Sequence, residues 1–332
     1  MAIPENVLSV VAGAAASQPP VSFWHHFSPG EASGQAAVDA HLRHFERWDL
    51  DFLKAMNDAG FPRPAPDWIA RSAADLSDLP ELTGSEPEFE AELEVVRSLR
   101  SRLGPGVPMI VTVFNAWATL RRLCEPETGT HGPPKIVAWD ARDDTISRML
   151  AEDAEAVANA VALLGRGLAR FAARCLEAGA DGIFLSVRDD WVDAPPNPAG
   201  SYDEIVKPAD LAILDAAGEA SFNMLHICGK ALDFARFAAY PAHVLNWADR
   251  YAGPSLSEAK ALTDKPLSGG VDNLNTLPNG TPEQVEAEVR DAIRQAGDRA
   301  FLLTPGCTYD PSSVPDENLS AMLRAARSVT AG

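Results

Sequence analysis

Residues 222–229 read FNMLHICG, a short apolar run that stops at a glycine. Short runs of aliphatic, β-branched and aromatic residues bounded by turn residues are typical of buried strands. Similar runs recur along the chain and alternate with longer helical stretches, which is the pattern of α/β proteins. We therefore expect eight strands, at Pro20–Phe27, Asp51–Met56, Met109–Phe114, Gly182–Val187, Phe222–Ile227, His243–Trp247, Pro266–Val271 and Ala300–Thr304.

The stretches between these runs predict helices at Gly34–Trp48, Glu88–Leu103, Thr145–Ala178, Glu204–Ala217, Thr281–Gln295 and Ser312–Ala331. We expect the long Ala-rich helix to break near Gly165. Eight strands separated by helices favour a closed parallel (β/α)8 barrel, the TIM barrel, over an open doubly wound sheet. No linker marks a second domain, so the prediction is a single α/β domain over residues 1–332. Pro62–Pro87 and Glu125–Pro134 are predicted loop insertions at the carboxyl ends of the strands.

The chain has 332 residues with 47 acidic and 28 basic side chains, a formal net charge of −19. Nucleic acids and anionic membrane surfaces attract basic patches, so neither is expected as a partner. The four cysteines are far apart and form no disulfide framework. The apolar start at residues 7–16 lacks a basic flank, and no apolar run reaches the roughly 18 residues of a membrane span. A reducing cytoplasm is the expected location, where free thiolates can bind metals.

The tetrapeptide His226-Ile227-Cys228-Gly229 carries the strongest chemical signal. Residues i and i+2 of a strand point to the same face, so His226 and Cys228 are expected to project together into the barrel mouth. Cys307 follows the last predicted strand and reaches the same mouth. One imidazole and two thiolates fill three positions of a tetrahedral Zn²⁺ site and leave the fourth open, as catalytic zinc requires. The alternative is core packing, with the cysteines as small apolar side chains.

Other polar residues near predicted strand ends are candidates for the same pocket. Asp249 is a candidate fourth zinc ligand, and its alternative is a helix cap or an ion pair with Arg250. His25 and His26 are neighbours on a strand, so only one should face the mouth; we take His26 as the catalytic candidate, with a structural histidine as the alternative. Asp272 has a second interpretation as a turn cap. The candidates for contacts with a cofactor are Asn115, Trp117, Asp189 and Asp272.

Segments spread over nearly the whole chain resemble the uroporphyrinogen decarboxylase superfamily. They are Pro20–Phe27, Leu50–Met56 (LDFLKAM), Ala178–Phe184 (AGADGIF), Leu225–Gly229 (LHICG), Leu267–Asn273 (LSGGVDN), Leu303–Cys307 (LTPGC) and Pro315–Met322 (PDENLSAM). The superfamily contains decarboxylases of acidic tetrapyrroles that use no cofactor. A second branch uses zinc to transfer methyl groups between corrinoid proteins and thiols such as coenzyme M. The resemblance implies a TIM barrel in either case.

Two observations separate the branches. His226, Cys228 and Cys307 fall on the zinc-ligand positions of the methyltransferase branch. The decarboxylases hold carboxylates with arginines in the loop after the first strand, whereas residues 25–31 here read HHFSPGE and contain none. The resemblance therefore implies the methyltransferase branch. Asp51 falls near an aspartate of the decarboxylases and is the catalytic candidate if the chain decarboxylates.

Three functions remain open at this point. The first is a zinc-dependent methyltransferase that moves a methyl group from a corrinoid, such as methylcobalamin or a corrinoid protein, to a small-molecule thiol activated by zinc. The second is a cofactor-independent decarboxylase of a smaller carboxylic acid, with Asp51 or a histidine as proton donor. The third is a non-enzymatic barrel that binds a corrinoid or another ligand. The resemblance also suggests a homodimer.

Overall fold

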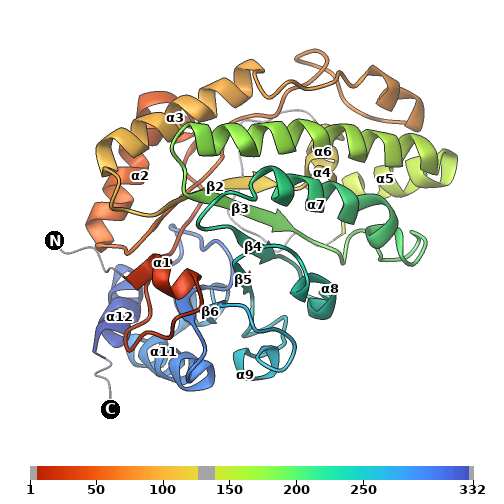
Figure 1. Ribbon diagram of the computed structural model, residues 1–332. Helices are drawn as coiled ribbons and strands as arrows, with labels where there is room; N and C mark the ends of the chain where they lie inside the picture. The colour runs from red at the N-terminus through yellow and green to blue at the C-terminus, as the bar shows by residue number, and fades with distance from the viewer. Residues whose placement is uncertain (1–5, 126–138, 329–332) are drawn as a thin grey trace.

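A parallel seven-stranded sheet forms the centre of the computed structural model, which describes residues 6–125 and 139–328 (Figure 1). Its strands follow one another in sequence order, and each pairs in parallel with the next. This order, with helices around the sheet, is a TIM-barrel-like α/β fold. The strands are β1 Leu53–Ala55, β2 Met109–Phe114, β3 Gly182–Val187, β4 Met224–Ile227, β5 Val244–Trp247, β6 Leu267–Val271 and β7 Phe301–Pro305.

The predicted first strand, Pro20–Phe27, is not a regular strand in the structure. It makes one isolated parallel bridge, between Val21 and Leu303 of β7. On the other side, the Asp51 N–H donates to the Val21 carbonyl at 2.9 Å, so this segment contacts both outer edges of the sheet. Pro20 has no N–H to donate, and the Val21 N–H donates to the Asp51 carboxylate at 2.7 Å. A side chain therefore replaces part of the ladder that an eighth strand would form.

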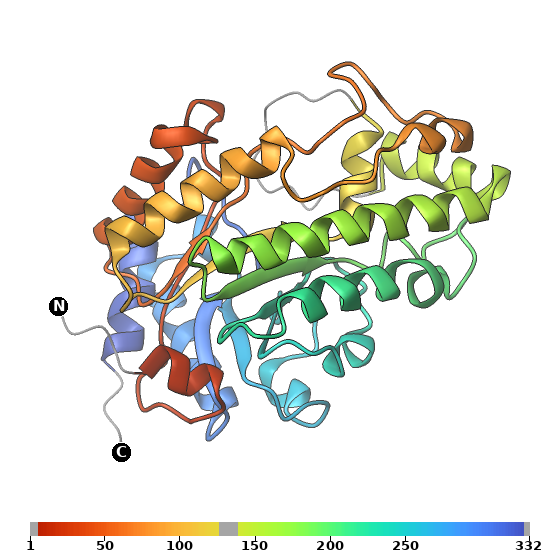
Figure 2. The same ribbon diagram turned by 45° about the horizontal axis from the view of Figure 1, so that its top comes forward.

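The helices surround the sheet, with α6 against β2 and β3 and α11 against β6 and β7 (Figures 1 and 2). The predicted helix Gly34–Trp48 is confirmed with both ends, and most others agree to within a few residues. The helices are α1 Asn6–Val11, α2 Gly34–Trp48, α3 Pro87–Leu103, α4 Ala116–Leu123, α5 Ala141–Glu152, α6 Ala154–Glu177, α7 Lys207–Ala216, α8 Phe234–Ala238, α9 Leu256–Ala259, α10 Thr276–Asn279, α11 Pro282–Ala296 and α12 Asp316–Arg327. Shorter turns of helix are η1 Pro29–Glu31, η2 Ala73–Asp78 and the π-helical η3 Tyr202–Val206.

The expected break of the long helix near Gly165 is wrong. The break lies at Asp153, whose carboxylate accepts a hydrogen bond from the Ala156 N–H and caps the start of α6. Gly165 lies inside α6. A Cβ at this position would come within 2.6 Å of the Ala209 Cβ on α7, so there is no room for a larger residue. The glycine therefore permits close packing of two helices and does not end one.

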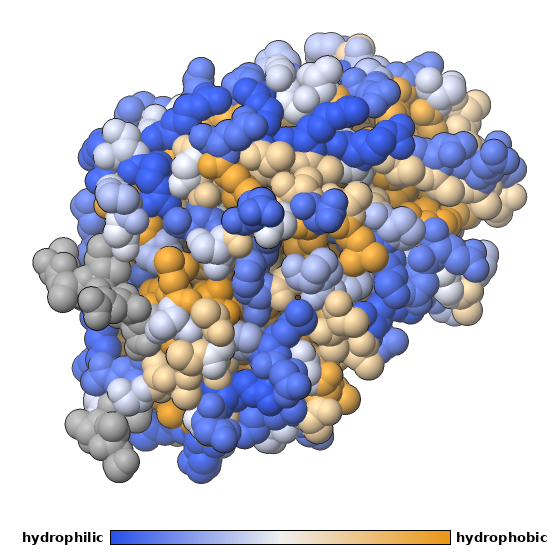
Figure 3. All heavy atoms as spheres, viewed as in Figure 1, coloured by the Kyte–Doolittle hydropathy of each residue, from blue (hydrophilic) through white to orange (hydrophobic). Residues whose placement is uncertain are grey.

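Two apolar cores lie on the two faces of the sheet. The larger core fills the space between the strands and the helices. The smaller core lies inside the curled sheet and includes Ile110, Met224 and Leu302. Val7 and Val10 of α1 pack into this inner core, so the apolar N-terminal segment covers the end of the sheet where the strands begin. Figure 3 shows apolar atoms over α1 on the outer surface, where Leu8 is 41% exposed.

The predicted insertions fall partly within the described residues. Residues 62–86 contain η2 and otherwise run as irregular loop, and Pro87 begins α3. In the second insertion, only Glu125 is described; residues 126–134 lie outside the described part. Contrary to expectation, one described helix, α6, has the length and composition of a membrane span, but half of its apolar window is buried in the protein, as in a core helix.

Candidate metal centre

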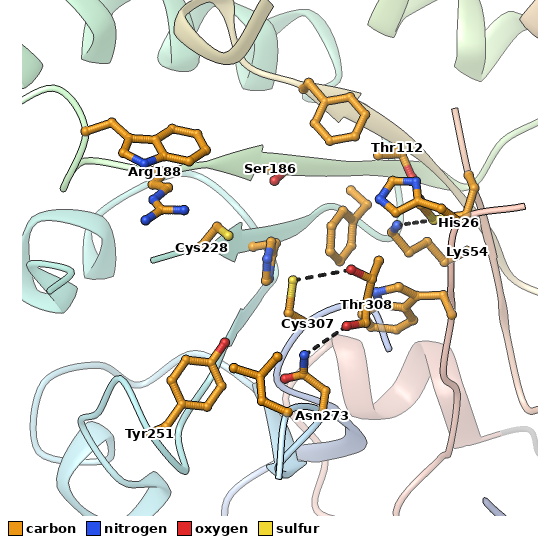
Figure 4. Close-up of a pocket in the computed structure, with 17 residues that line it drawn as sticks. His26, Lys54, Thr112, Ser186, Arg188, Cys228, Tyr251, Asn273, Cys307 and Thr308 are labelled. Carbon is orange, nitrogen blue, oxygen red and sulfur yellow. Dashed lines mark hydrogen bonds between the residues drawn. The ribbon is translucent and has the colours of Figure 1, made fainter. Parts of the chain in front are cut away.

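The structure brings together the three residues predicted as zinc ligands. His226 lies in β4, Cys228 directly after it, and Cys307 two residues after β7. One donor atom from each lies within 4.8 Å of the other two, at the carboxyl ends of the strands (Figure 4). Strand alternation explains the pairing, because Ile227 between them packs into the outer core while His226 faces inward.

Two glycines allow the chain to bring these ligands together. Gly229 has a φ of +119°, and a Cβ there would come within 2.7 Å of the Asp190 carboxylate, so only glycine turns comfortably after Cys228. Gly306 has no room for a side chain, because a Cβ would lie 2.5 Å from the Ala248 Cα. The chain after β7 can therefore approach the chain after β5 closely enough to place Cys307.

A buried amide fixes the imidazole of His226. The Nδ1 atom of His226 lies 2.6 Å from the Oδ1 atom of Asn246, which is opposite it on β5. The Asn246 Nδ2 group donates to the Ser268 carbonyl at 3.2 Å and to the Thr304 hydroxyl at 3.1 Å, and because a carbonyl only accepts, the amide oxygen faces His226. His226 therefore donates from Nδ1 and leaves the Nε2 lone pair for a ligand. Such support of a ligating histidine is common in metal sites.

The two sulfurs influence each other's ionisation. Interaction with Cys228 lowers the pKa of the Cys307 thiol. The same interaction, together with burial, raises the pKa of the Cys228 thiol. The pair of thiols therefore favours the loss of one proton and opposes the loss of the second. A divalent cation removes this conflict, because metal ligation favours the deprotonated form of both thiols.

These residues fit a zinc ion. Two ligand atoms on one tetrahedral zinc lie roughly 3.5–3.8 Å apart when bonds are about 2.3 Å to sulfur and 2.0–2.1 Å to nitrogen. The spread of no more than 4.8 Å among the donors of His226, Cys228 and Cys307 needs only small side-chain shifts to reach that spacing. Two thiolates and an imidazole are also the donor types that zinc prefers.

Asp249, the predicted fourth ligand, is not part of this group. Its Oδ1 atom accepts from the Gly270 N–H at 2.8 Å, and its Oδ2 atom lies 3.3 Å from the Arg250 Nε atom. The group of mutually close donor atoms contains His226, Cys228 and Cys307 without it. In the structure, Asp249 therefore forms the alternative ion pair with Arg250.

A cavity of about 160 Å³ opens beside the three ligands. His26 lines it and His25 does not, in agreement with the expected alternation. The Nδ1 atom of His26 lies 2.6 Å from Asp58, a buried carboxylate that the sequence interpretation did not single out. Asp58 follows the predicted second strand, and this position at a strand end was the available signal.

The remaining predicted site residues lie outside the cavity lining. Asn115 caps α4 by accepting from the Ala118 N–H, and Trp117 packs in the outer core. Asp189 forms an ion pair with Arg236 at 2.9 Å. Each of these side chains contacts nearby structure and none lines the cavity, so their assignment as cofactor contacts stays a prediction.

Two further predicted carboxylates also form hydrogen bonds with nearby backbone. Asp272 accepts from the Leu274 and Asn275 N–H groups, which is the turn-capping alternative. Asp51 accepts from the Val21 N–H at 2.7 Å and helps to join the N-terminal segment to β1. Neither lines the cavity, so Asp51 is not placed to donate a proton there.

Lys54 is the most unusual residue that sequence reasoning missed. It lies in β1, is 4% exposed, and lines the cavity. Burial lowers the pKa of its ammonium group to about 7, while the nearby Asp58 opposes the shift. Its signal was present in the sequence, because it is the one charged residue within FLKAM.

Tyr251, Asn273 and Trp191 also line the cavity and were not predicted. Figure 4 shows Tyr251 and Asn273 on the side of Cys307, whereas Arg188 lies beside Cys228. The Arg188 guanidinium stacks 3.7 Å from the Trp191 ring centroid. The cavity therefore combines aromatic walls with a few polar groups that converge on the three ligands, as in many small-molecule sites.

The fold and the site together define an α/β barrel-like protein with a thiolate-rich metal-ligand cluster at the carboxyl ends of its strands. Residues 55–329 match the model of the family described as Uroporphyrinogen decarboxylase (URO-D). The chain therefore belongs to the uroporphyrinogen decarboxylase family.

Solved structures resemble this chain in fold. A methyltransferase from Methanosarcina mazei superposes with a TM-score of 0.70 at 16% identity, over 97% of both chains. A B12-independent methionine synthase from Shewanella sp. W3-18-1 gives a TM-score of 0.45 at 14% identity, covering 71% of this chain and 66% of that one. A protein from Listeria monocytogenes described as a B12-independent methionine synthase gives 0.47 at 14% identity, covering 72% and 70%. A search of curated proteins finds no match to the sequence.

Proposed function

We propose that this chain is a zinc-dependent methyltransferase that moves a methyl group from a corrinoid donor to a small thiol. The observation that carries the proposal is the convergence of His226, Cys228 and Cys307 beside a cavity at the carboxyl ends of the strands. Family membership supports it, and so does the fold shared with a protein described as a methyltransferase from M. mazei.

His226, Cys228 and Cys307 would hold the zinc ion. When bound, zinc supplies an open coordination position that lowers the pKa of an incoming thiol and so provides a nucleophilic thiolate at neutral pH. Asn246 keeps the His226 ring oriented for that role. The aromatic walls formed by Phe184 and Trp191 exclude water from the thiol.

The transfer itself balances without an oxidant or reductant. The thiol loses its proton, and its sulfur forms a bond to the methyl carbon. The bond from that carbon to the donor breaks, and its electron pair stays on the donor. The chain's contribution is to hold the thiol beside the ligands and to leave the cavity open to the donor, so that the reacting atoms meet in line. His26, oriented by Asp58, is the nearby group that can accept the thiol proton.

The decarboxylase alternative loses one of its two proton donors, because the Asp51 carboxylate is hydrogen-bonded to Val21 and lies outside the cavity lining. The cavity has a volume of about 160 Å³. That space suits a small substrate better than a tetrapyrrole. A non-enzymatic ligand-binding barrel differs from both enzymes in that it shows no turnover.

The test is a metal analysis followed by a transfer assay. Protein purified without added metal should contain about one zinc per chain, as a three-ligand site predicts. The same protein should then convert methylcobalamin and a thiol to cob(I)alamin and a thioether, which absorbance and mass spectrometry detect. Zinc without turnover on any thiol would favour the binding protein. Absence of zinc would rule out the proposal, and release of carbon dioxide from a small acid would favour the decarboxylase.

A further inference from the structure

The cavity is basic although the chain as a whole is acidic. The chain has a net charge of −19, yet no aspartate or glutamate is among the described residues that line the cavity. Apart from cysteine and tyrosine, the ionisable side chains that line it are His26, Lys54, Arg188 and His226. Clefts with one sign of charge attract ligands of the opposite sign. The lining therefore favours an anionic ligand.

Lys54 and Arg188 differ in how their positive charge is compensated within the cavity wall. The Arg188 guanidinium forms a two-pronged ion pair with Asp190, so its charge is already compensated. Lys54 forms no ion pair with a carboxylate in residues 6–125 and 139–328. Its Nζ atom lies 2.6 Å from the Met56 sulfur and 4.3 Å from the Phe184 ring centroid. These are weak partners for a buried ammonium group, whose burial is costly without a counter-charge.

We propose that Lys54 is the anion-binding residue of this cavity and pairs with the carboxylate of a small thiol acid. The thiol of that molecule would reach His226, Cys228 and Cys307, and this part of the proposal rests on the proposed function. Figure 4 shows the arrangement that suggests two-point binding, with Cys307 between Lys54 on one side and Cys228 on the other. The residue thus determines substrate specificity.

The surroundings of Lys54 favour a single carboxylate over a polyanion. A lysine presents one compact charge with three donors, whereas phosphate sites in proteins add arginine forks or backbone N–H groups. Trp24 and Phe184, whose rings lie 5.3 Å and 4.3 Å from Nζ, leave little room for more polar groups around it. The cavity volume of about 160 Å³ also limits the ligand to a short chain.

The first experiment uses ligands without a thiol, so that it does not depend on zinc. Propionate and its neutral analogue 1-propanol are titrated into metal-free protein, and binding is followed by the fluorescence of Trp24 and Trp191, which line the cavity. Wild-type protein should bind propionate about 10- to 100-fold more tightly than propanol, the range expected for a buried charged hydrogen bond. Lys54→Met should lose this preference and bind both ligands similarly.

Lys207→Met is the matched control. Lys207 is a partly exposed lysine of α7 that pairs with Asp203 and does not line the cavity, so this variant removes the same charge elsewhere on the protein. It should keep the full preference for propionate. Lys54→Gln serves as a second variant if Lys54→Met does not fold. The inference fails if wild-type protein binds propionate no better than propanol, if neither ligand saturates, or if the folded Lys54 variants keep the preference.

A second experiment connects the carboxylate to the thiol. Zinc-loaded protein is titrated with 3-mercaptopropionate and with 3-mercapto-1-propanol, and Lys54→Met should weaken only the acid, by about 10- to 100-fold. A preference for propionate in protein that binds no zinc would keep the anion site and reject the methyltransferase. Zinc binding without any preference for propionate over propanol would keep the zinc site and reject Lys54 as the anion-binding residue.

Discussion

At one end of the cavity, the imidazole of His226 is held by Asn246, and the amide of Asn246 is held by Thr304 and Ser268. At the other end, the ammonium group of Lys54 meets a thioether sulfur and aromatic rings. We call these the ligand end and the lysine end. The ligand end has a supporting network that fixes its donors, whereas the lysine end has a buried ammonium group that forms no ion pair with a carboxylate of the described residues.

The difference shows two ways in which a site can be prepared for its ligand. A network of satisfied hydrogen bonds orients donor atoms before anything binds, and this reduces the cost of binding. An uncompensated buried charge instead makes the empty protein less stable, and the ligand removes that penalty.

The largest effect is expected at the ligand end. Cys307→Ser should weaken zinc binding by more than ~100-fold, because it removes a ligand, whereas loss of a supporting partner typically costs 10–100-fold. Chelator competition and elemental analysis measure the change. Cys124→Ser, at the end of α4 with its thiol bonded to the Leu120 carbonyl, is the control and should keep its zinc. Equal zinc affinity in the two variants would break the assignment of this end.

Acid should destabilise the protein near the lysine end, because it protonates His41, whose ring holds the chain after β1. The Met56 N–H donates to His41 Nε2 at 2.8 Å, and Nδ1 bonds to the Ala37 carbonyl at 2.7 Å, so the ring must be neutral. Burial lowers the pKa of His41 from 6.5 to about 4. Between these values the unfolded chain binds the proton and the folded chain does not. The free energy of unfolding should therefore fall by about 3 kcal/mol from pH 6.5 to pH 4.

Denaturant titrations over this pH range measure the effect. His41→Gln, whose amide oxygen can still accept from Met56, should show a shallower fall because it has no proton to gain. If wild type and variant lose stability with the same slope, His41 does not support this end in the way described.

Loss of the supporting network at the ligand end should have a smaller effect. Asn246→Leu leaves His226 Nδ1 without its acceptor, and zinc affinity should fall by about 10- to 100-fold. Asn223→Leu is the matched control, since Asn223 is another buried asparagine whose side chain bonds to the Ile183 N–H and the Ala217 carbonyl at the opposite end of the strands. Both variants lose stability, but only the first should lose zinc affinity. Similar zinc affinities in both would show that orientation by Asn246 is unimportant.

The smallest effect distinguishes the lysine end most clearly. Lys54→Met removes a buried ammonium group that pairs with no described carboxylate and should raise the free energy of unfolding of the ligand-free protein at pH 7 by about 1–2 kcal/mol. Lys207→Met, which breaks an exposed ion pair with Asp203, should change it by less than about 1 kcal/mol. A marked loss of stability in Lys54→Met would mean that the ammonium group is already well stabilised within the protein.

Local rules explain the parts of the molecule that were predictable from sequence. The helix Gly34–Trp48 and the strand Gly182–Val187 have the predicted ends, because their apolar periodicity is local. The pairing of His226 with Cys228 follows from strand alternation alone. The approach of Cys307 needed only the expectation that parallel strands end on one face of a barrel.

The rest depended on contacts between distant segments. Asp51 was expected in the site, but its carboxylate is taken by Val21, a partner 30 positions away along the chain. Gly165 was expected to break a helix, but its role depends on Ala209 of another helix. Asn246 becomes the partner of His226 only once β4 and β5 are paired in register. Lys54 could be noticed as a charge in an apolar run, but only the folded chain shows that no carboxylate of the described residues forms an ion pair with it.

The short helix α1, which covers the end of the sheet where the strands begin, has a practical consequence. A protein trimmed to the family match at residues 55–329 would lack Val7 and Val10, and the inner core around Ile110 would face solvent. Exposed apolar surface of that kind promotes association between molecules. Trimming there would also remove Lys54 and His26 from the cavity wall. Expression of the shortened chain would therefore yield aggregates, and an inactive preparation would be mistaken for evidence against catalysis.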